Sequence, residues 1–231
     1  MRNQQARHDF GLPRIFFVRY IQMVMRSSLQ LELRATNRGG ARKGSGPKKK
    51  RTSGVPHLRR PHLASRHPVH VTLKLRPGLP SLRSDRCYET VRSALKAGRR
   101  RLGTRLVHFS VQSNHLHLVV EATDAVALGR GIKGLAVRLA RRLNARLGTK
   151  GVVFPDRFHA HVLRSPSEVR NALGYVLNNY ALHLEQDGYV IPAGTRDLLS
   201  SAAWLTAPPP ELAPVVAPET WLLKEGWRLA A

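Results

Sequence analysis

The sequence predicts an α+β fold: a ferredoxin-like (RRM-like) antiparallel sheet with an added helix that bears a tyrosine. Four segments alternate apolar and polar residues with the period of a strand, and three repeat apolar residues with the period of a helix. Their order is strand, helix, strand, strand, helix, strand, helix. The first six elements complete a β-α-β-β-α-β unit, whose two helices cover one face of the sheet. The last helix can then cross the other face.

The first two elements are a strand and a helix. Residues 67–76 alternate apolar side chains such as Val69 with polar ones such as His70, which predicts a half-buried strand. Residues 81–101 carry apolar side chains at helical spacing and finish in a basic run. We therefore expect a helix that continues to Arg101.

The next two elements are predicted to form a hairpin. Only Gln112 and Ser113 separate the strand at residues 105–111 from the strand at residues 114–121. A connection this short joins neighbouring antiparallel strands, because a parallel pair needs a long crossover.

The second strand of this hairpin has two different faces. Because strand side chains alternate, His115 and His117 point to one side, and Leu116 and Leu118 point to the other. The apolar side can pack on helices, so we expect the histidine side to be an open working surface. Two imidazoles that point the same way can hold one divalent cation without distortion of the backbone.

Residues 124–148 predict a long basic amphipathic helix that ends at Gly148. Its leucines form one apolar stripe, and its cations project elsewhere. Such a face can simply be solvated, but the chain has few acids to pair with these cations, which favours contact with phosphates. The basic side chains that we assign to DNA contact on this helix are Arg130, Lys133, Arg138, Arg141 and Arg142.

The fourth strand, residues 157–164, holds a second pair of alternate histidines, His159 and His161. This pair competes with the first for a metal ion, and periodicity does not choose between them. Arg157 and Arg164 stand at the two ends of the strand, and we assign both to DNA contact.

The last helix opens with a capping box that runs from Ser165 to Glu168. Tyr180 falls on its apolar stripe and is predicted to be core. Tyr175 and Asn179, four residues apart, share a different face. A tyrosine held among amides in a basic protein with histidine pairs is a candidate nucleophile.

Composition divides the chain into three parts: a basic, largely disordered arm over residues 1–66, a folded domain over 67–188, and a tail with prolines and tryptophans over 189–231. A flexible segment in which glycines separate basic residues can follow the path of a phosphate backbone. In the arm, the residues that we assign to DNA contact are Arg42, Lys43, Lys48, Lys49, Lys50 and Arg51.

The charge balance points to a polyanion. Lys and Arg number 39 against 14 Asp and Glu, a formal net charge of +25. Nucleic acid is the polyanion that such a balance favours. An anionic membrane is the alternative, but no apolar run approaches the ~18 residues of a spanning helix. Cys87 is the only cysteine, so no intrachain disulfide is possible, and we expect a cytoplasmic protein.

Two stretches together resemble a known family. Residues 114–120 are similar to the His-hydrophobic-His (HUH) motif of the single-tyrosine transposases. Residues 156–164, followed by 175–179, resemble the tyrosine-helix segment of that family. Within it, the REP-associated tyrosine transposases are the most similar branch, and the glycine-rich basic arm is similar to N-terminal sequences in that branch. The resemblance covers roughly residues 67–186.

The resemblance implies roles for particular residues. His115 and His117 would be metal ligands, and Tyr175 the nucleophile. Asn179 would supply a third ligand, with Asn178 as the second choice. The histidines at 159 and 161 would then be structural or would contact DNA.

The resemblance also implies a reaction. The protein would cleave and rejoin single-stranded DNA near hairpins through a 5′-phosphotyrosine, with Mg²⁺ or Mn²⁺ as cofactor, as a monomer or a homodimer. Two alternatives stand beside it: a domesticated protein that binds DNA hairpins without cleaving them, and an RNA-binding module. The second is less favoured because the strands lack paired aromatic residues for base stacking.

Overall fold

A five-stranded antiparallel sheet organises the described part of the chain, which in this computed structural model comprises residues 62–186, 195–205 and 211–230 with the single positions 188, 190 and 192. Its strands are β1 (Val69–Lys74), β2 (Arg100–Arg101), β3 (Thr104–Val111), β4 (His115–Ala122) and β5 (His159–Val162). The helical elements are α2 (Asp85–Gly98), α3 (Ala125–Leu147), α4 (Pro166–Gln186), η1 (Ser201–Trp204), α5 (Trp221–Lys224) and η2 (Gly226–Leu229).

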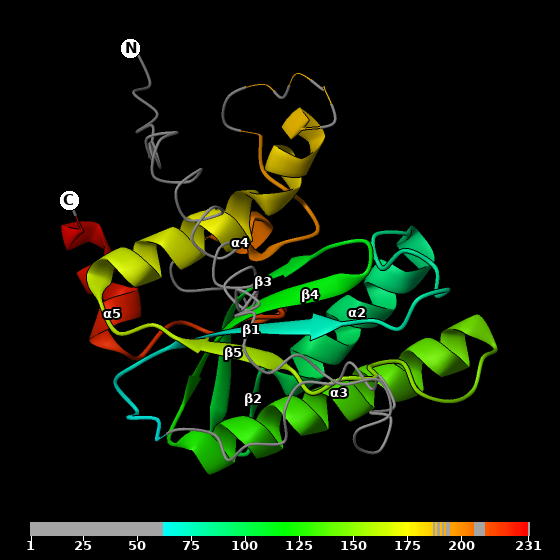
Figure 1. The fold of residues 1–231 in the computed structure, drawn as a ribbon, viewed down its shortest axis with the longest axis horizontal. Coiled ribbons are helices and arrows are strands. Elements are labelled where there is room, and N and C mark those ends of the chain that lie inside the picture. Colours follow the sequence, from blue (N-terminus) through cyan, green and yellow to red (C-terminus); the bar gives the residue numbers. More distant parts are fainter. Residues whose placement is uncertain are drawn as a thin grey trace, which may run out of the picture. The chain divides into compact units, whose positions relative to one another are not determined.

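The strands lie in the order β2-β3-β4-β1-β5 (Figure 1). Without the short edge strand β2, this is the arrangement expected of a β-α-β-β-α-β unit, so the predicted α+β fold class is confirmed. β1 pairs antiparallel with β4 on one side and with β5 on the other. The predicted hairpin is β3 and β4.

The apolar face of the sheet packs on α2 and α3 (Figure 1). One core cluster joins Leu116 and Leu118 of β4 to Val91 of α2 and to Ile132 and Leu139 of α3. This is the face that strand alternation assigned to helix packing.

The opposite face of the sheet is crossed by α4, as expected for the added helix (Figure 1). Val169, Leu173 and Val176 of this helix are buried in a second cluster with Val107 of β3 and Val119 of β4. A register irregularity between Leu106 and His108 turns Val107 toward this side.

The predicted start of α4 and the predicted end of α3 are confirmed. At the start of α4, the backbone N–H of Glu168 donates to the hydroxyl of Ser165 at 3.2 Å, and the Ser165 N–H donates back to the Glu168 carboxylate at 3.3 Å. At the start of α3, the carboxylate of Asp124 accepts from two backbone N–H groups. Gly148 ends α3 with φ 67°, a left-handed conformation that favours glycine.

The C-terminal segments cover the open edge of β3. The N–H of Val111 donates to the carbonyl of Leu199 at 3.1 Å, and the N–H of Val216 donates to the carbonyl of Leu106 at 2.9 Å. An uncovered edge strand would leave these backbone groups without partners in the protein. Both segments are therefore bound to the sheet through backbone hydrogen bonds to its β3 strand.

The structure corrects the end of the first helix. α2 ends at Gly98 instead of continuing to Arg101. Arg100 and Arg101 form β2 and pair with the start of β3 through a tight turn, in which Leu102 has φ 53° and Gly103 has φ 75°. Pairing with β3 outweighs the helical propensity of arginine, which is a weak preference by comparison.

The tryptophans of the tail behave differently from one another. Trp204 and Trp227 are partly buried and each packs against one of the two core clusters, so both anchor the tail to the domain. Trp221 is 53% exposed. Within the described residues, no helix is long and apolar enough to cross a bilayer.

Candidate active site

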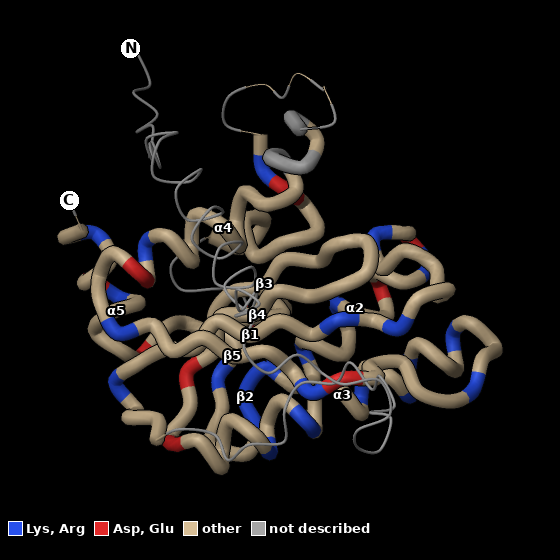
Figure 2. The backbone as a smooth tube through the Cα atoms, viewed as in Figure 1, with Lys and Arg blue, Asp and Glu red and all other residues tan. Residues whose placement is uncertain are grey.

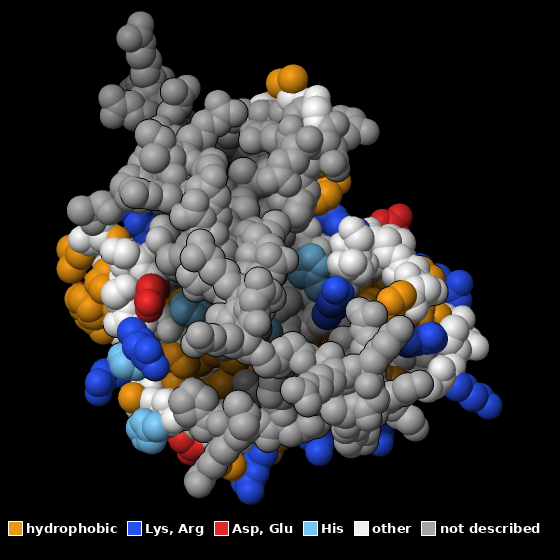
Figure 3. Space-filling view, viewed as in Figure 1, with side chains coloured by type: hydrophobic (Ala, Val, Ile, Leu, Met, Phe, Trp, Pro, Cys, Tyr) orange, Lys and Arg blue, Asp and Glu red, His pale blue; other side chains and the backbone are white. Residues whose placement is uncertain are grey.

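Histidines from four strands share the face of the sheet that α4 crosses. Residues paired across antiparallel strands point to the same side. His70 of β1 is paired with Val119 of β4 and with His161 of β5, and Thr72 is paired with His117 and with His159. His108 of β3 also faces Val119. Both histidine pairs noted in the sequence therefore lie on this one face, and Figure 3 shows histidine side chains close to Lys and Arg side chains.

His115 and His117 turn the same ring nitrogen toward each other. Their Nε2 atoms are 2.9 Å apart. Two nitrogens bound at right angles to one cation, each at about 2.1 Å, lie about 3 Å apart. The pair thus already has the spacing of two adjacent ligands in octahedral coordination. His115 is further oriented by Asn114, whose Oδ1 lies 2.7 Å from the His115 Nδ1.

His70 orients His117 from the other side. The Nε2 of His70 lies 3.1 Å from the Nδ1 of His117, and the hydroxyl of Thr72 lies 3.3 Å from the same atom. Burial, and then the nearby rings of His161, His159 and His115, lower the pKa of His70 to about 3. His70 is therefore neutral at pH 7, so its Nε2 can accept a proton donated by His117 Nδ1. That tautomer leaves the His117 Nε2 lone pair directed at His115.

His70 is a site residue that sequence reasoning missed. Alternation placed it on the polar side of the first strand, but nothing in its spacing connected it with a histidine 47 positions later. Only the pairing of β1 with β4 brings the two rings together.

Tyr175 reaches this histidine cluster from α4. Its ring centroid lies 4.9 Å from that of His117 and 6.0 Å from that of His70, with the rings edge to face in both cases. The side chain is half-buried, and burial raises the pKa of the Tyr175 phenol above its usual value. The helix therefore brings a protonated phenol to the same face as the imidazoles.

Asn179 and Asn178 have different surroundings. Asn179 is 2% exposed, and its Nδ2 has no hydrogen-bond partner within the described ranges. Asn178 is exposed. A buried amide without a partner costs free energy, and a half-turn of the group would present its oxygen instead. Asn179 is thus the asparagine that fits a third ligand position.

The direction of α4 carries the turn that follows Tyr175 toward the start of β4. Early residues of the helix pack near Val119, and Tyr175 contacts His117 further along. On the next turn, Tyr180 lies under the guanidinium of Arg83, and this arginine donates to the carbonyl of Val111, near the start of β4. The candidate donors would be two imidazoles and one amide. Across the described ranges, no three His, Cys, Asp or Glu side chains group into a metal site.

The second histidine pair lies on the far side of β1. His159 is exposed and His161 is half-buried, and the Nε2 of His161 has no partner in the described part of the chain. In the sheet, β1 with His70 lies between the strands that carry the two pairs. The two pairs are therefore neighbours on one surface rather than separate sites.

Two expectations about exposure are wrong. The histidine face is not an open surface at its centre, because α4 covers it and His117 is only 5% exposed. Tyr180 is not core but half-buried, with the guanidinium carbon of Arg83 3.4 Å from its ring centroid. Asp197 holds that arginine in place through contacts of 2.8 and 3.0 Å.

The predicted DNA-contacting cations lie in different places. Arg157 and Arg164 are exposed at the ends of β5. The cations of α3 lie on the other side of the sheet from Tyr175, and Figure 2 shows Lys and Arg gathered around α3 and β2. Those α3 residues are Arg130, Lys133, Arg138, Arg141 and Arg142. The arm residues, Arg42, Lys43, Lys48, Lys49, Lys50 and Arg51, lie outside the described residues.

Comparisons with known proteins found similarity only among solved structures. No protein-family model matches the chain, and no curated protein matches it. One similar structure is a REP-associated tyrosine transposase bound to a REP hairpin, with 19% identity and a TM-score of 0.45 over 56% of this chain and 74% of that one. Another is a bacterial tRNA(His) guanylyltransferase (Thg1)-like protein in complex with ATP, with 13% identity and a TM-score of 0.38 over 56% of this chain and 66% of that one.

Proposed function

We propose that this protein is a metal-dependent DNA transesterase that cleaves and rejoins single-stranded DNA near hairpins through a single tyrosine. The observation that carries the proposal is the contact between the rings of Tyr175 and His117. A phenol from a late helix meets a histidine pair that already has the spacing of two ligands. The motif resemblance and the net charge of +25 support the same function.

His115, His117 and Asn179 would hold Mg²⁺ or Mn²⁺. When bound, the cation would neutralise charge on a non-bridging phosphate oxygen and orient the phosphate for attack. The chain prepares this position in two ways. His70 and Thr72 hold the His117 ring from behind, and α4 excludes water from the centre of the site.

The Tyr175 oxygen would attack phosphorus in line. The bond from phosphorus to the tyrosine oxygen forms as the bond to the 3′ oxygen breaks. This leaves a 5′-phosphotyrosine and a free 3′-hydroxyl, which takes up a proton. Because burial raises the pKa of Tyr175, the phenol is protonated at pH 7 and must lose its proton as the new bond forms. Attack by a 3′-hydroxyl reverses the step, so no nucleotide cofactor is consumed.

A covalent-adduct experiment tests the proposal. A labelled oligonucleotide with a hairpin and a single-stranded flank is incubated with protein and Mn²⁺, then run on a denaturing gel. We expect an adduct with the wild type and none with Tyr175→Phe. Tyr180→Phe, on the same helix and also half-buried, is the matched control and should keep the adduct. An adduct that persists in Tyr175→Phe would move the nucleophile elsewhere.

The burial of Tyr175 favours one alternative function, a protein that binds DNA hairpins without cleaving them. A raised pKa reduces the fraction of the phenol that is ionised, and the ionised oxygen is the effective nucleophile. This alternative predicts that wild-type protein binds the hairpin tightly but forms no adduct with any divalent cation. Binding and adduct formation are measured in the same experiment, so the two functions are separated by one result.

A further inference from the structure

The helix α4 is held on the sheet by two different kinds of contact. Its first turns are buried in the apolar cluster that contains Val107 and Val119 of the sheet. Beyond Leu177, no described residue of α4 belongs to an apolar cluster. Asn179 and Tyr180 lie in this later part of the helix. A contact other than apolar packing therefore holds the turn that carries the candidate third ligand.

That contact is the stack between the ring of Tyr180 and the guanidinium of Arg83. The guanidinium carbon lies 3.4 Å from the ring centroid. A cation is attracted by the negative face of an aromatic ring, and more strongly where water is excluded. The side chain of Arg83 is only 15% exposed, so water screens this attraction little.

Arg83 is fixed to the sheet independently of the helix. It donates to the carbonyl of Val111, the last residue of β3, at 2.7 Å. Its backbone lies in the turn before α2, where the N–H of the neighbouring Leu82 donates to the carbonyl of Ser113 at 2.8 Å. Ser113 stands two residues before His115. Both contacts tie Arg83 to the connection that leads into the candidate metal ligands.

Asp197 neutralises Arg83. Two guanidinium nitrogens donate to the two oxygens of this carboxylate at 2.8 and 3.0 Å, and the Asp197 side chain is 3% exposed. The carboxylate is in turn oriented by the N–H of Leu199 at 3.0 Å. A planar guanidinium that is paired and buried in this way orients the groups that it touches, and is not available to an incoming phosphate.

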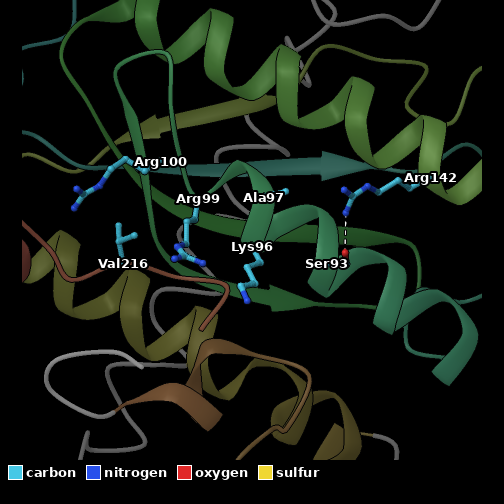
Figure 4. Close-up of a pocket in the computed structure, with 7 residues that line it drawn as sticks. All are labelled: Ser93, Lys96, Ala97, Arg99, Arg100, Arg142 and Val216. Carbon is cyan, nitrogen blue, oxygen red and sulfur yellow. Dashed lines mark hydrogen bonds between the residues drawn. The ribbon is translucent and has the colours of Figure 1, made fainter. Parts of the chain in front are cut away.

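An arginine on the other side of the sheet shows the difference. Arg142 lines a pocket with Lys96 and Arg100 and donates to the hydroxyl of Ser93 at 2.8 Å (Figure 4). In the described part of the chain, no acid pairs with Arg142. Its charge is therefore uncompensated, whereas Arg83 has a buried acid, a strand carbonyl and a ring as partners.

The position of Asn179 depends on how its turn of α4 is held. The residue is 2% exposed, and its Nδ2 has no hydrogen-bond partner within the described ranges. With that nitrogen untied, the helix backbone and the packing around it set where the amide oxygen lies. An oxygen ligand of Mg²⁺ lies about 2.1 Å from the ion, so a small shift of the turn takes it out of range. Tyr180 is the next residue, and its stack on Arg83 sets the position of that turn.

We propose that Arg83 is a positioning residue of the metal site: through its stack on Tyr180 it holds Asn179 within reach of the cation. The inference rests on the proposed function for the cation and for the ligand role of Asn179. Arg83 itself contacts neither the ion nor DNA. It acts as a fixed link between the turn that leads into His115 and the later part of α4.

Substitutions of Arg83 test this role through the affinity for Mn²⁺, measured on the full chain by electron paramagnetic resonance. Arg83→Met removes the guanidinium, and Arg83→Lys keeps the charge without the planar group. We expect both to weaken Mn²⁺ binding by about tenfold, as removal of a group that orients a ligand does. Electrostatics alone predicts the opposite for Arg83→Met, because loss of a positive charge near a cation site strengthens binding.

Arg105 supplies the matched control. Its side chain is 14% exposed and pairs with a carboxylate, that of Glu121, which is 4% exposed. The corresponding values for Arg83 and Asp197 are 15% and 3%. Arg105→Met should lower the free energy of unfolding, as Arg83→Met should, but leave the affinity for Mn²⁺ unchanged. Equal losses of affinity in the two variants would overturn the proposal, because they would reflect a general loss of stability.

A double-mutant cycle shows whether Arg83 acts through Asn179. If it does, Arg83→Met should cost no further affinity in a protein that already carries Asn179→Ala. Additive losses would show that the arginine acts by another route and would overturn the proposal. Tyr180→Phe keeps the ring and should keep the wild-type affinity, whereas Tyr180→Leu removes the ring and should match Arg83→Met. Equal losses in the two Tyr180 variants would contradict the stack.

Hydrogen exchange separates failure of this proposal from failure of the proposed function. Exchange of the α4 amides beyond Leu177 is measured by mass spectrometry without any metal. Arg83→Met should accelerate exchange there relative to the first turns of α4, and Arg105→Met should not. A wild type that binds no Mn²⁺ would refute the proposed metal site, while faster exchange in Arg83→Met would still show that Arg83 holds the turn. Unchanged exchange in Arg83→Met would refute that hold, whatever the affinity for Mn²⁺.

Discussion

His70 Nε2 lies 3.1 Å from His117 Nδ1, so a buried and neutral imidazole can accept a hydrogen bond from a candidate metal ligand. This relationship joins the first strand of the sheet to the third strand of the β-α-β-β-α-β unit. It determines the tautomer of His117 and leaves the other ring nitrogen for the cation. His70 is therefore a positioning residue.

Replacement of His70 should weaken metal binding without removing a ligand. Loss of the group that hydrogen-bonds the other ring nitrogen of a metal-bound histidine typically costs about 10–100-fold in metal affinity. We expect a loss of this size in His70→Phe, which fills the space but cannot accept the proton. His70→Gln offers a carbonyl oxygen and should recover part of the affinity. Mn²⁺ titration followed by electron paramagnetic resonance measures both, and equal losses would contradict the role.

Substitutions at Asn179 and at its neighbour Asn178 test which asparagine is the third metal ligand. Asn179→Ala should lower Mn²⁺ affinity by at least about tenfold, since a direct ligand should matter no less than an outer-shell partner. Asn178→Ala, at the exposed neighbouring position, should have little effect. The readout is the rise in melting temperature on addition of Mn²⁺, which reports binding to the folded state without any cleavage. A larger effect in Asn178→Ala would exchange the two assignments.

Glu121 should be important for stability and not for catalysis. It is 3% exposed, pairs with Arg105 at 3.1 Å, and accepts from the backbone N–H groups of Glu219 and Thr220. Removal of one partner of a buried pair costs about 3–5 kcal/mol. Arg105 keeps its ion pair with the exposed carboxylate of Glu219, which places the expected loss at the lower end of that range. We expect Glu121→Ala to lower the free energy of unfolding by about 3 kcal/mol and to release the C-terminal segment to proteases.

Glu89 supplies the control for that experiment. Its pair with Arg92 is shorter, at 2.8 Å, but both side chains are exposed. Exposed pairs contribute about 0–1 kcal/mol. Glu89→Ala should therefore change the free energy of unfolding by less than about 1 kcal/mol in the same urea titration. Similar losses in the two variants would show that burial of Glu121 is not the cause.

His108 should make the fold sensitive to mild acid. Burial lowers the pKa of His108 to about 4, whereas in the unfolded chain it is near 6.5. Between these values the unfolded state binds the proton and the folded state does not, so the free energy of unfolding falls as pH falls from 6.5 to 4. The limit is about 1.4 kcal/mol per pH unit, and the partly exposed ring should show a fraction of it.

A substitution isolates this effect from the other histidines. His108→Asn keeps a polar group near the hydroxyl of Ser201, which lies 3.2 Å from the ring, but cannot take up a proton. Urea unfolding at pH 7 and at pH 5 should show a smaller loss of stability in the variant than in the wild type. An identical loss in both proteins would show that His108 does not contribute.

Much of the fold could be predicted from the sequence because its signals are local. Alternation along residues 114–121 identifies a strand and separates the side with His115 from the side with Leu116, since neighbouring side chains must point apart. The Ser165 capping box marks the start of α4 for a similar reason, because a helix must satisfy its first N–H groups nearby. Such patterns need no knowledge of distant residues.

The tertiary structure decided what depends on neighbours far along the chain. The end of α2 differs from the prediction because Arg100 and Arg101 pair with β3. Tyr180 is half-buried instead of core because its ring stacks on the guanidinium of Arg83, which pairs with Asp197. In both cases a long-range partner outweighs a weak local preference.

The candidate site shows the same division. The sequence by itself determined that His115 and His117 share a face and that Tyr175 and Asn179 share another, because both follow from periodicity. Only the folded chain decided that α4 lies across that face, that Tyr175 contacts His117, and that His70 lies behind it. Periodicity assigns a side chain to a side of its own element, whereas contact requires the pairing of strands and the packing of a helix, which are set by the whole core.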